Sequence, residues 1–164
     1  MLDTFPQNIP LKTWQQSLRP GHILTFRFPV QGSDAIPKVR PCLVLDVFMR
    51  DGKRYVSLAY GTTSETSANR GYEIHVADGL GLQLSGLRKP TRFVAARRIT
   101  VSLDHPDIVC NRAGTPIIGH LVGASFDRMN AVRARIQAIA DMRREKLERR
   151  AAQRRRTPQQ LSLF

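Results

Sequence analysis

The chain has 164 residues, of which 41% are hydrophobic, and this matches about one domain with a single core. Its 26 Lys and Arg residues outnumber its 13 Asp and Glu residues, and the formal net charge of +13 favours a polyanionic partner such as RNA or DNA. No run of about 18 apolar residues is present to span a membrane, and no basic and apolar leader opens the chain, so we expect a cytoplasmic protein without a membrane partner.

The first half of the chain reads as strands separated by turns. A short helix is predicted over 11–18, and β-forming residues predict a strand over 22–28. Glycine and proline predict an exposed loop over 29–37. The next strand is predicted over 39–48, and its apolar run 42–47 is typical of a strand buried on both faces.

The second half continues the pattern of short strands. Asp51-Gly52 is a strong hairpin signal and predicts a return strand over 54–60. The polar stretch 61–71 is predicted to be a loop. Further strands are predicted over 72–76, over 91–101 as one strand or two, and over 117–121.

A helix follows the last strand. Ser125 is the predicted N-cap, and Asp127 suits the first helical turn. Apolar residues recur every three or four positions and should cover the strands as far as about Met142; they are Phe126, Met129, Val132, Ile136, Ile139 and Met142. The predicted fold is therefore α+β and mainly β: a small, SH3-like antiparallel barrel, a long C-terminal helix and a disordered basic tail.

The positive charge is concentrated near the C-terminus. Residues 143–156 carry 8 basic and 2 acidic side chains, so about half of the excess lies in this short segment. Pro158 should end the helix by about Thr157. We expect three parts: an N-terminal extension over 1–20, a barrel with its helix over 21–142, and a basic helical extension with a docking tail over 143–164.

The cysteines indicate no metal centre. Cys42 and Cys110 stand far apart, outside any Cys-x-x-Cys or Cys/His cluster, which makes a zinc site unfavourable. Two isolated cysteines in a protein that is not exported are typically buried thiols. We expect neither a metal nor another cofactor.

Four segments in order resemble the PemK/MazF-type toxins, the endoribonucleases of a class of bacterial toxin–antitoxin modules. The segments are Gly21-His22-Ile23, Gly32-Ser33-Asp34, Arg40-Pro41-Cys42-Leu43-Val44-Leu45, and Tyr60-Gly61-Thr62-Thr63-Ser64 followed by Gly71-Tyr72-Glu73-Ile74. The resemblance spans about residues 21–140. The chain departs from the family's pattern in Pro37-Lys38, in a slightly longer loop before Arg40, and in Arg97-Arg98.

The resemblance implies cleavage of single-stranded RNA by its own 2′-hydroxyl group. That reaction moves protons at two oxygens and builds negative charge on phosphorus, but its nucleophile is already tethered. By the resemblance, Arg40 is the catalytic arginine and Thr62 its hydroxyl partner. An arginine fork suits the phosphate charge better than it suits proton abstraction. Asp34, Lys38, Thr63 and Ser64 are the expected substrate-binding residues.

The family also implies a homodimer that is neutralised by a cognate antitoxin. A second peptide signal lies at the end of the chain, where Gln160-Leu161-Ser162-Leu163-Phe164 resembles the peptide with which bacterial polymerases and repair proteins dock on the replicative sliding clamp. The alternative reading of these apolar residues is contact with the protein's own barrel or with a partner subunit. The alternative function is a non-catalytic protein on the same barrel that binds nucleic acid or the clamp and interferes with replication.

Overall fold

The described part of the chain combines one antiparallel sheet with three helices. The computed structural model describes residues 13–29, 36–66 and 68–160. Within them the strands are β1 (His22–Arg27), β2 (Val39–Arg50), β3 (Lys53–Thr62), β4 (Glu73–Val76), β5 (Thr91–Ser102) and β6 (Ile117–His120). The helices are α1 (Thr13–Ser17), α2 (Gly79–Ser85) and α3 (Gly123–Gln160). The predicted α+β class is confirmed.

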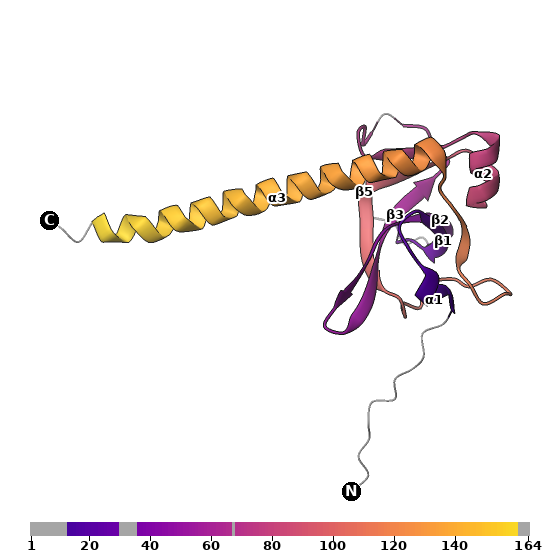
Figure 1. The fold of residues 1–164 in the computed structure, drawn as a ribbon, viewed down its shortest axis with the longest axis horizontal. Coiled ribbons are helices and arrows are strands. Elements are labelled where there is room, and N and C mark those ends of the chain that lie inside the picture. Colours follow the sequence, from indigo (N-terminus) through magenta and orange to yellow (C-terminus); the bar gives the residue numbers. More distant parts are fainter. Residues whose placement is uncertain (1–12, 30–35, 67, 161–164) are drawn as a thin grey trace, which may run out of the picture. The chain divides into compact units, whose positions relative to one another are not determined.

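The six strands form a single sheet in the order β4-β5-β3-β2-β1-β6. The sheet curls into a half-barrel (Figure 1). The predicted hairpin is confirmed, because Asp51 and Gly52 join β2 to β3 with positive φ angles of 51° and 73°. Two such residues match the twist of the flanking strands, which fixes the pairing of β2 with β3.

The concave side of the sheet holds the main core. Phe26, Val44 and Leu58 are fully or almost fully buried there, and each comes from a different strand. Trp14 of helix α1 and Leu18, which follows the helix, join the same cluster, so part of the expected N-terminal extension belongs to the core. The other face is also buried in places, where Ile74 and Phe93 lie opposite each other on β4 and β5.

Strand β5 contains a large irregularity. Ala59 pairs with Arg98, but the next residue of β3, Tyr60, pairs with Val94. The intervening residues 95–97 therefore have no partner in this ladder, and β5 is one strand with a bulge where the sequence allowed one strand or two. A bulge bends its strand and redirects the side chains on it.

Helix α2 is the element that the sequence reasoning missed. The side chain of Asp78 caps its N-terminus by accepting a hydrogen bond from the Gly81 N–H, and Gly86 closes its C-terminus with φ of 71°. A Cβ atom at Gly86 would lie 2.1 Å from the carbonyl oxygen of Ile118 on β6. Glycine is required there both by the left-handed backbone and by the close contact.

Helix α3 corrects two predictions at its start. It begins at Gly123, and the predicted N-cap Ser125 instead donates a hydrogen bond from its hydroxyl to the carbonyl oxygen of His75 at 2.8 Å. Met129 is fully buried, but Met142 is 61% exposed, so the apolar face is not covered as far as predicted. No described helix is long and apolar enough to cross a membrane.

The later part of α3 corrects two more predictions. The chain divides into two compact units, Met1–Met129 and Asn130–Phe164. In the second unit the basic segment 143–156 is helical, as in the predicted helical extension and unlike the predicted disordered tail, because Arg, Ala, Glu and Gln favour helices and Glu145 pairs with Arg149. The helix passes Pro158 and ends at Gln160, since the φ angle of proline is itself helical.

Candidate nucleic-acid site

Arg40 lies near the start of β2, beside the end of β3. It is half-buried and pairs with Phe26 of β1. Its guanidinium carbon stands 5.3 Å from the centre of the Tyr60 ring, and the guanidinium carbon of Arg97 stands 4.7 Å from the same ring. Two cations thus share one aromatic ring, and each contact contributes about 0.5–1 kcal/mol at an exposed site.

The ring of Tyr60 packs against other aromatic side chains. It meets Phe28 at 5.1 Å in an edge-on contact, and Phe28 in turn meets the buried Phe26 at 6.3 Å. Arg97 reaches this ring because it belongs to the bulge of β5, opposite the end of β3. We call Arg40, Tyr60 and Arg97 the arginine–tyrosine cluster. It presents two positive charges for phosphate, and the guanidinium planes of its arginines can stack with a nucleobase.

Thr62 ends β3 and is 8% exposed. Its hydroxyl oxygen accepts a hydrogen bond from the Ser64 N–H at 3.1 Å. Continuing the β2–β3 register from Cys42 and Tyr60 places Thr62 opposite Arg40. The strands remain close there, because a Cβ atom at Gly61 would lie 2.3 Å from the carbonyl oxygen of Pro41. Among the described residues, no hydrogen bond joins Arg40 to Thr62.

Two neighbouring hollows connect the predicted site residues. The Arg40 hollow, of about 350 Å³, is lined by Arg40, Thr63, Arg88 and Lys89 among others. The Thr62 hollow, of about 530 Å³, is lined by Thr62, Thr63, Ser64, His75 and Lys89 among others. Thr63, Lys89 and Thr91 line both hollows and form their common wall. Arg40 and Thr62 therefore face adjoining spaces on either side of this wall.

The remaining predicted residues divide into two groups. Thr63 and Ser64 are exposed and line the Thr62 hollow, whereas Lys38 is exposed just before β2 and lines neither hollow. Asp34 and Leu161, Ser162, Leu163 and Phe164 lie outside the described residues. Gln160 is described only as the last residue of α3.

A buried ion pair supports the Thr62 hollow. Arg92 and Glu73 are 7% and 9% exposed, and the Arg92 guanidinium donates to the Glu73 carboxylate. The same guanidinium donates to the carbonyl oxygens of Thr66 at 3.4 Å and Ala68 at 3.3 Å, and to the Thr66 hydroxyl at 3.1 Å. Arg92 therefore fixes the polar segment after β3, which forms one side of this hollow.

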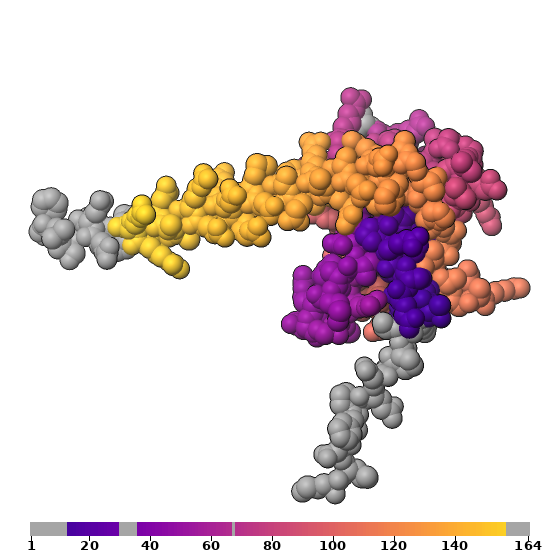
Figure 2. Space-filling model, viewed as in Figure 1, coloured from indigo at the N-terminus to yellow at the C-terminus, as the bar shows by residue number. Residues whose placement is uncertain are grey.

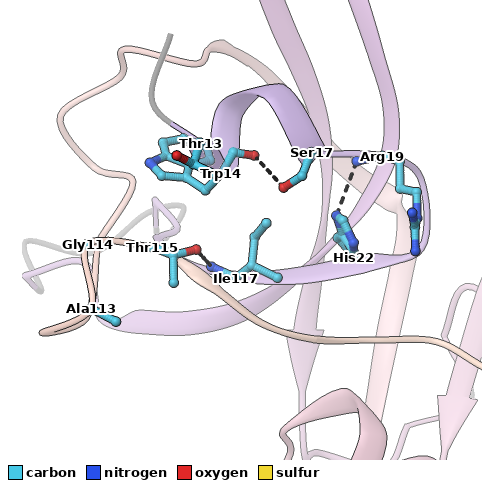
Figure 3. A pocket seen from close by; sticks show the side chains of 9 residues that line it. All are labelled: Thr13, Trp14, Ser17, Arg19, His22, Ala113, Gly114, Thr115 and Ile117. Atoms are coloured by element: carbon cyan, nitrogen blue, oxygen red, sulfur yellow. Dashed lines mark hydrogen bonds between the residues drawn. The ribbon is translucent and has the colours of Figure 1, made fainter.

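A third hollow lies away from these residues. It has a volume of about 870 Å³ and opens between α1 and the loop of Ala113 to Thr115 (Figure 3), which projects from the body in Figure 2. Burial, together with Arg19 and His120, lowers the pKa of His22 on its wall. The Trp14 indole N–H, also on the wall, has no hydrogen-bond partner among the described residues.

Sequence reasoning missed three features of the site. The pairing of Glu73 with Arg92 joins two strands far apart in sequence, and no local pattern signals it. Arg97 stood out only as a departure from the family pattern, and its contact with Tyr60 depends on the bulge. His75 sits in an alternating strand that resembles any exposed edge, although Glu73 two residues earlier was an available signal.

Neither the protein-family models nor the curated proteins contain a match to this chain. Its function must therefore be argued from the site itself.

Proposed function

We propose that this protein is a metal-independent endoribonuclease that cleaves single-stranded RNA, as its resemblance to PemK/MazF-type toxins implies. The observation that carries the proposal is the arginine–tyrosine cluster beside the two hollows. Arg40 and Arg97 hold two positive charges on one ring, and Lys89 stands on the common wall. Such a surface suits an unpaired base and its phosphates better than it suits a small neutral substrate.

The proposed reaction uses the 2′-hydroxyl group of the substrate as nucleophile. The 2′-oxygen bonds to phosphorus, the bond to the 5′-oxygen breaks, and the products carry a 2′,3′-cyclic phosphate and a 5′-hydroxyl. Arg40 stabilises the negative charge that develops on the phosphoryl oxygens. Thr63 and Lys89 on the common wall bind the phosphate, and the guanidinium groups held on the Tyr60 ring stack with a neighbouring base.

The test is sequencing of RNA ends after incubation of a transcript with purified protein. The wild type should produce 5′-hydroxyl ends at preferred positions, and Arg40→Ala should lower the cleavage rate by about 100-fold or more. Arg112→Ala removes an exposed arginine from the loop after β5 and serves as the matched control. If Arg40→Ala cleaves as fast as Arg112→Ala, the assignment of the site is wrong.

The proposal includes a homodimer and an antitoxin that neutralises the toxin in the cytoplasm. Both follow from the family resemblance. Arg40, Arg88 and Lys89, the basic residues of the Arg40 hollow, suit an acidic antitoxin segment. Light scattering of the purified protein tests the dimer. Co-expression with the product of a small neighbouring reading frame tests the antitoxin, which should abolish RNA cleavage.

The basic part of α3 favours a second candidate function, a non-catalytic protein that binds nucleic acid or the sliding clamp. Its eight cations lie along a continuous helix, so they can follow a phosphate backbone. The clamp peptide itself ends outside the described residues. Recovery of the clamp by the full chain, but not by a chain that lacks residues 160–164, would support the docking tail. Equal recovery would refute it.

A further inference from the structure

His75 lies beside the predicted site residues. It lies on the edge strand β4, its side chain is 63% exposed, and it lines the Thr62 hollow together with Thr62, Thr63 and Lys89. Its Nε2 atom is 3.0 Å from Oε2 of Glu73. One ring edge is thus tied to a buried carboxylate while most of the side chain remains accessible.

The partners of Glu73 determine which ring nitrogen of His75 is available. Burial raises the pKa of the Glu73 carboxyl, but hydrogen bonds from Arg92 and His75 and their charges outweigh it, so this pKa is lowered overall. The carboxylate is therefore ionised at neutral pH and only accepts hydrogen bonds. Nε2 of His75 must then carry the hydrogen, and Nδ1 of the neutral ring holds the free lone pair.

The backbone around this pair is fixed from two further elements. Two residues of α3 donate hydrogen bonds to this strand. The Ser125 hydroxyl donates to the carbonyl oxygen of His75 at 2.8 Å, and Nε of Arg128 donates to the carbonyl oxygen of Glu73 at 3.1 Å. His75 also pairs with Arg92 across the β4–β5 ladder. A catalytic group held this firmly loses little entropy when substrate binds.

Charged groups surround His75 on both sides. Lys89, Arg92 and Glu65 line the Thr62 hollow with it. Arg70 and Arg128 line a smaller hollow on its other side, together with Glu73. The cations outnumber the carboxylates, so a bound RNA phosphate is attracted to the neighbourhood of His75.

We propose that His75 is the general base of the RNA-cleaving reaction and that Glu73 is its positioning residue. This inference rests on the proposed endoribonuclease function. The scissile phosphate lies at the common wall of Thr63 and Lys89, with Arg40 on one side and His75 on the other. A guanidinium is a poor base, so His75 supplies the step that Arg40 does not.

Nδ1 of His75 takes the proton of the 2′-hydroxyl while the 2′-oxygen bonds to phosphorus. The bond between phosphorus and the 5′-oxygen then breaks, and that oxygen takes a proton from water. The imidazolium returns its proton to the hydroxide that remains, which restores the neutral ring.

The experiment compares wild type, His75→Gln, Arg40→Ala and His120→Gln, which alters an exposed histidine of β6 as the matched control. The measurements are RNA cleavage rate against pH, RNA affinity, and the circular dichroism spectrum. His75→Gln should cleave at least about 100-fold more slowly at neutral pH while binding RNA as tightly as wild type. The wild-type rate should rise from acid toward neutral pH, and His75→Gln should lose that rise.

A second variant separates chemistry from folding. His75→Ala should regain cleavage when imidazole is added, which a structural defect would not do. If the wild type and Arg40→Ala behave differently but His75→Gln cleaves normally, His75 is not the base and the proposed function survives. If the wild type itself leaves RNA intact, the proposed function fails first.

Discussion

Replacing Arg92 with methionine should destabilise the protein by about 3–5 kcal/mol, the cost of leaving one partner of a buried ion pair alone. Arg92 and Glu73 have side chains only 9% and 10% exposed, and Arg92 also holds Thr66 and Ala68. For a chain of this size, such a loss lowers the melting temperature by about 6–20 °C. Arg88→Met, at an exposed position before β5, should change stability by less than about 0.5 kcal/mol.

Urea denaturation followed by circular dichroism measures this loss of unfolding free energy. A double variant and the pH dependence test whether the ion pair is its cause. The double variant Arg92→Met with Glu73→Leu should recover part of the lost stability, because it also removes the buried carboxylate that Arg92→Met leaves without its partner. The lowered pKa of Glu73 means that the pair stabilises the fold above the ordinary carboxyl range and loses this effect as pH falls through the folded-state pKa. The gap between wild type and Arg92→Met should therefore narrow in acid. A cost below about 1 kcal/mol at neutral pH would refute the reasoning.

Three other outcomes are expected. Gly86→Ala should destabilise the protein by more than about 1 kcal/mol in the same denaturation assay, because the new Cβ meets the carbonyl oxygen of Ile118; an unchanged midpoint would contradict the close contact. A thiol reagent should label Cys110 quickly and Cys42 hardly at all in the native protein, because burial raises the pKa of Cys42 to about 12; equal labelling would show that Cys42 is accessible. Tyr60→Leu should weaken binding of a short single-stranded RNA by about 5-fold or more, because Arg40 and Arg97 lose the ring that holds them, as titration in a filter-binding assay would show; unchanged affinity would remove the ring from the binding surface.

The sequence predicted those elements whose signal is local. Residues 42–45 are buried in β2 as their apolar side chains indicate, while Asp46 is exposed, and Asp51 and Gly52 form the turn they indicate. The prediction from sequence failed where tertiary contacts determine the secondary structure. Helix α2 is only seven residues long and contains two glycines, so it depends on its caps and on the contact of Gly86 with β6.

The candidate site shows the same division. Arg40 and Thr63 were recognised from a linear pattern, and the structure places both on one hollow. The buried Cys42 fits the expectation for an isolated thiol, whereas Cys110 is exposed. The contact of the Arg97 guanidinium with the Tyr60 ring depends on a register shift in β5, and register is a property of two strands together.

The bulge of β5 also determines how this strand can change length. Val94 pairs with Tyr60 and Ile99 pairs with Leu58, and these two residues of β3 face the same side. Val94 and Ile99 therefore share a face although they are five positions apart, an odd number that regular alternation would place on opposite faces. Elsewhere in the sheet, deleting one residue would turn every following side chain to the opposite face. Ala95 is fully buried and donates its N–H to the carbonyl oxygen of Tyr72 at 2.8 Å, but residues 96 and 97 are exposed. A deletion at these two positions would bring β5 closer to plain alternation and leave the core residues facing inward. The cost would fall on Arg97, so this short segment can lose or change its charged surface while the fold remains intact.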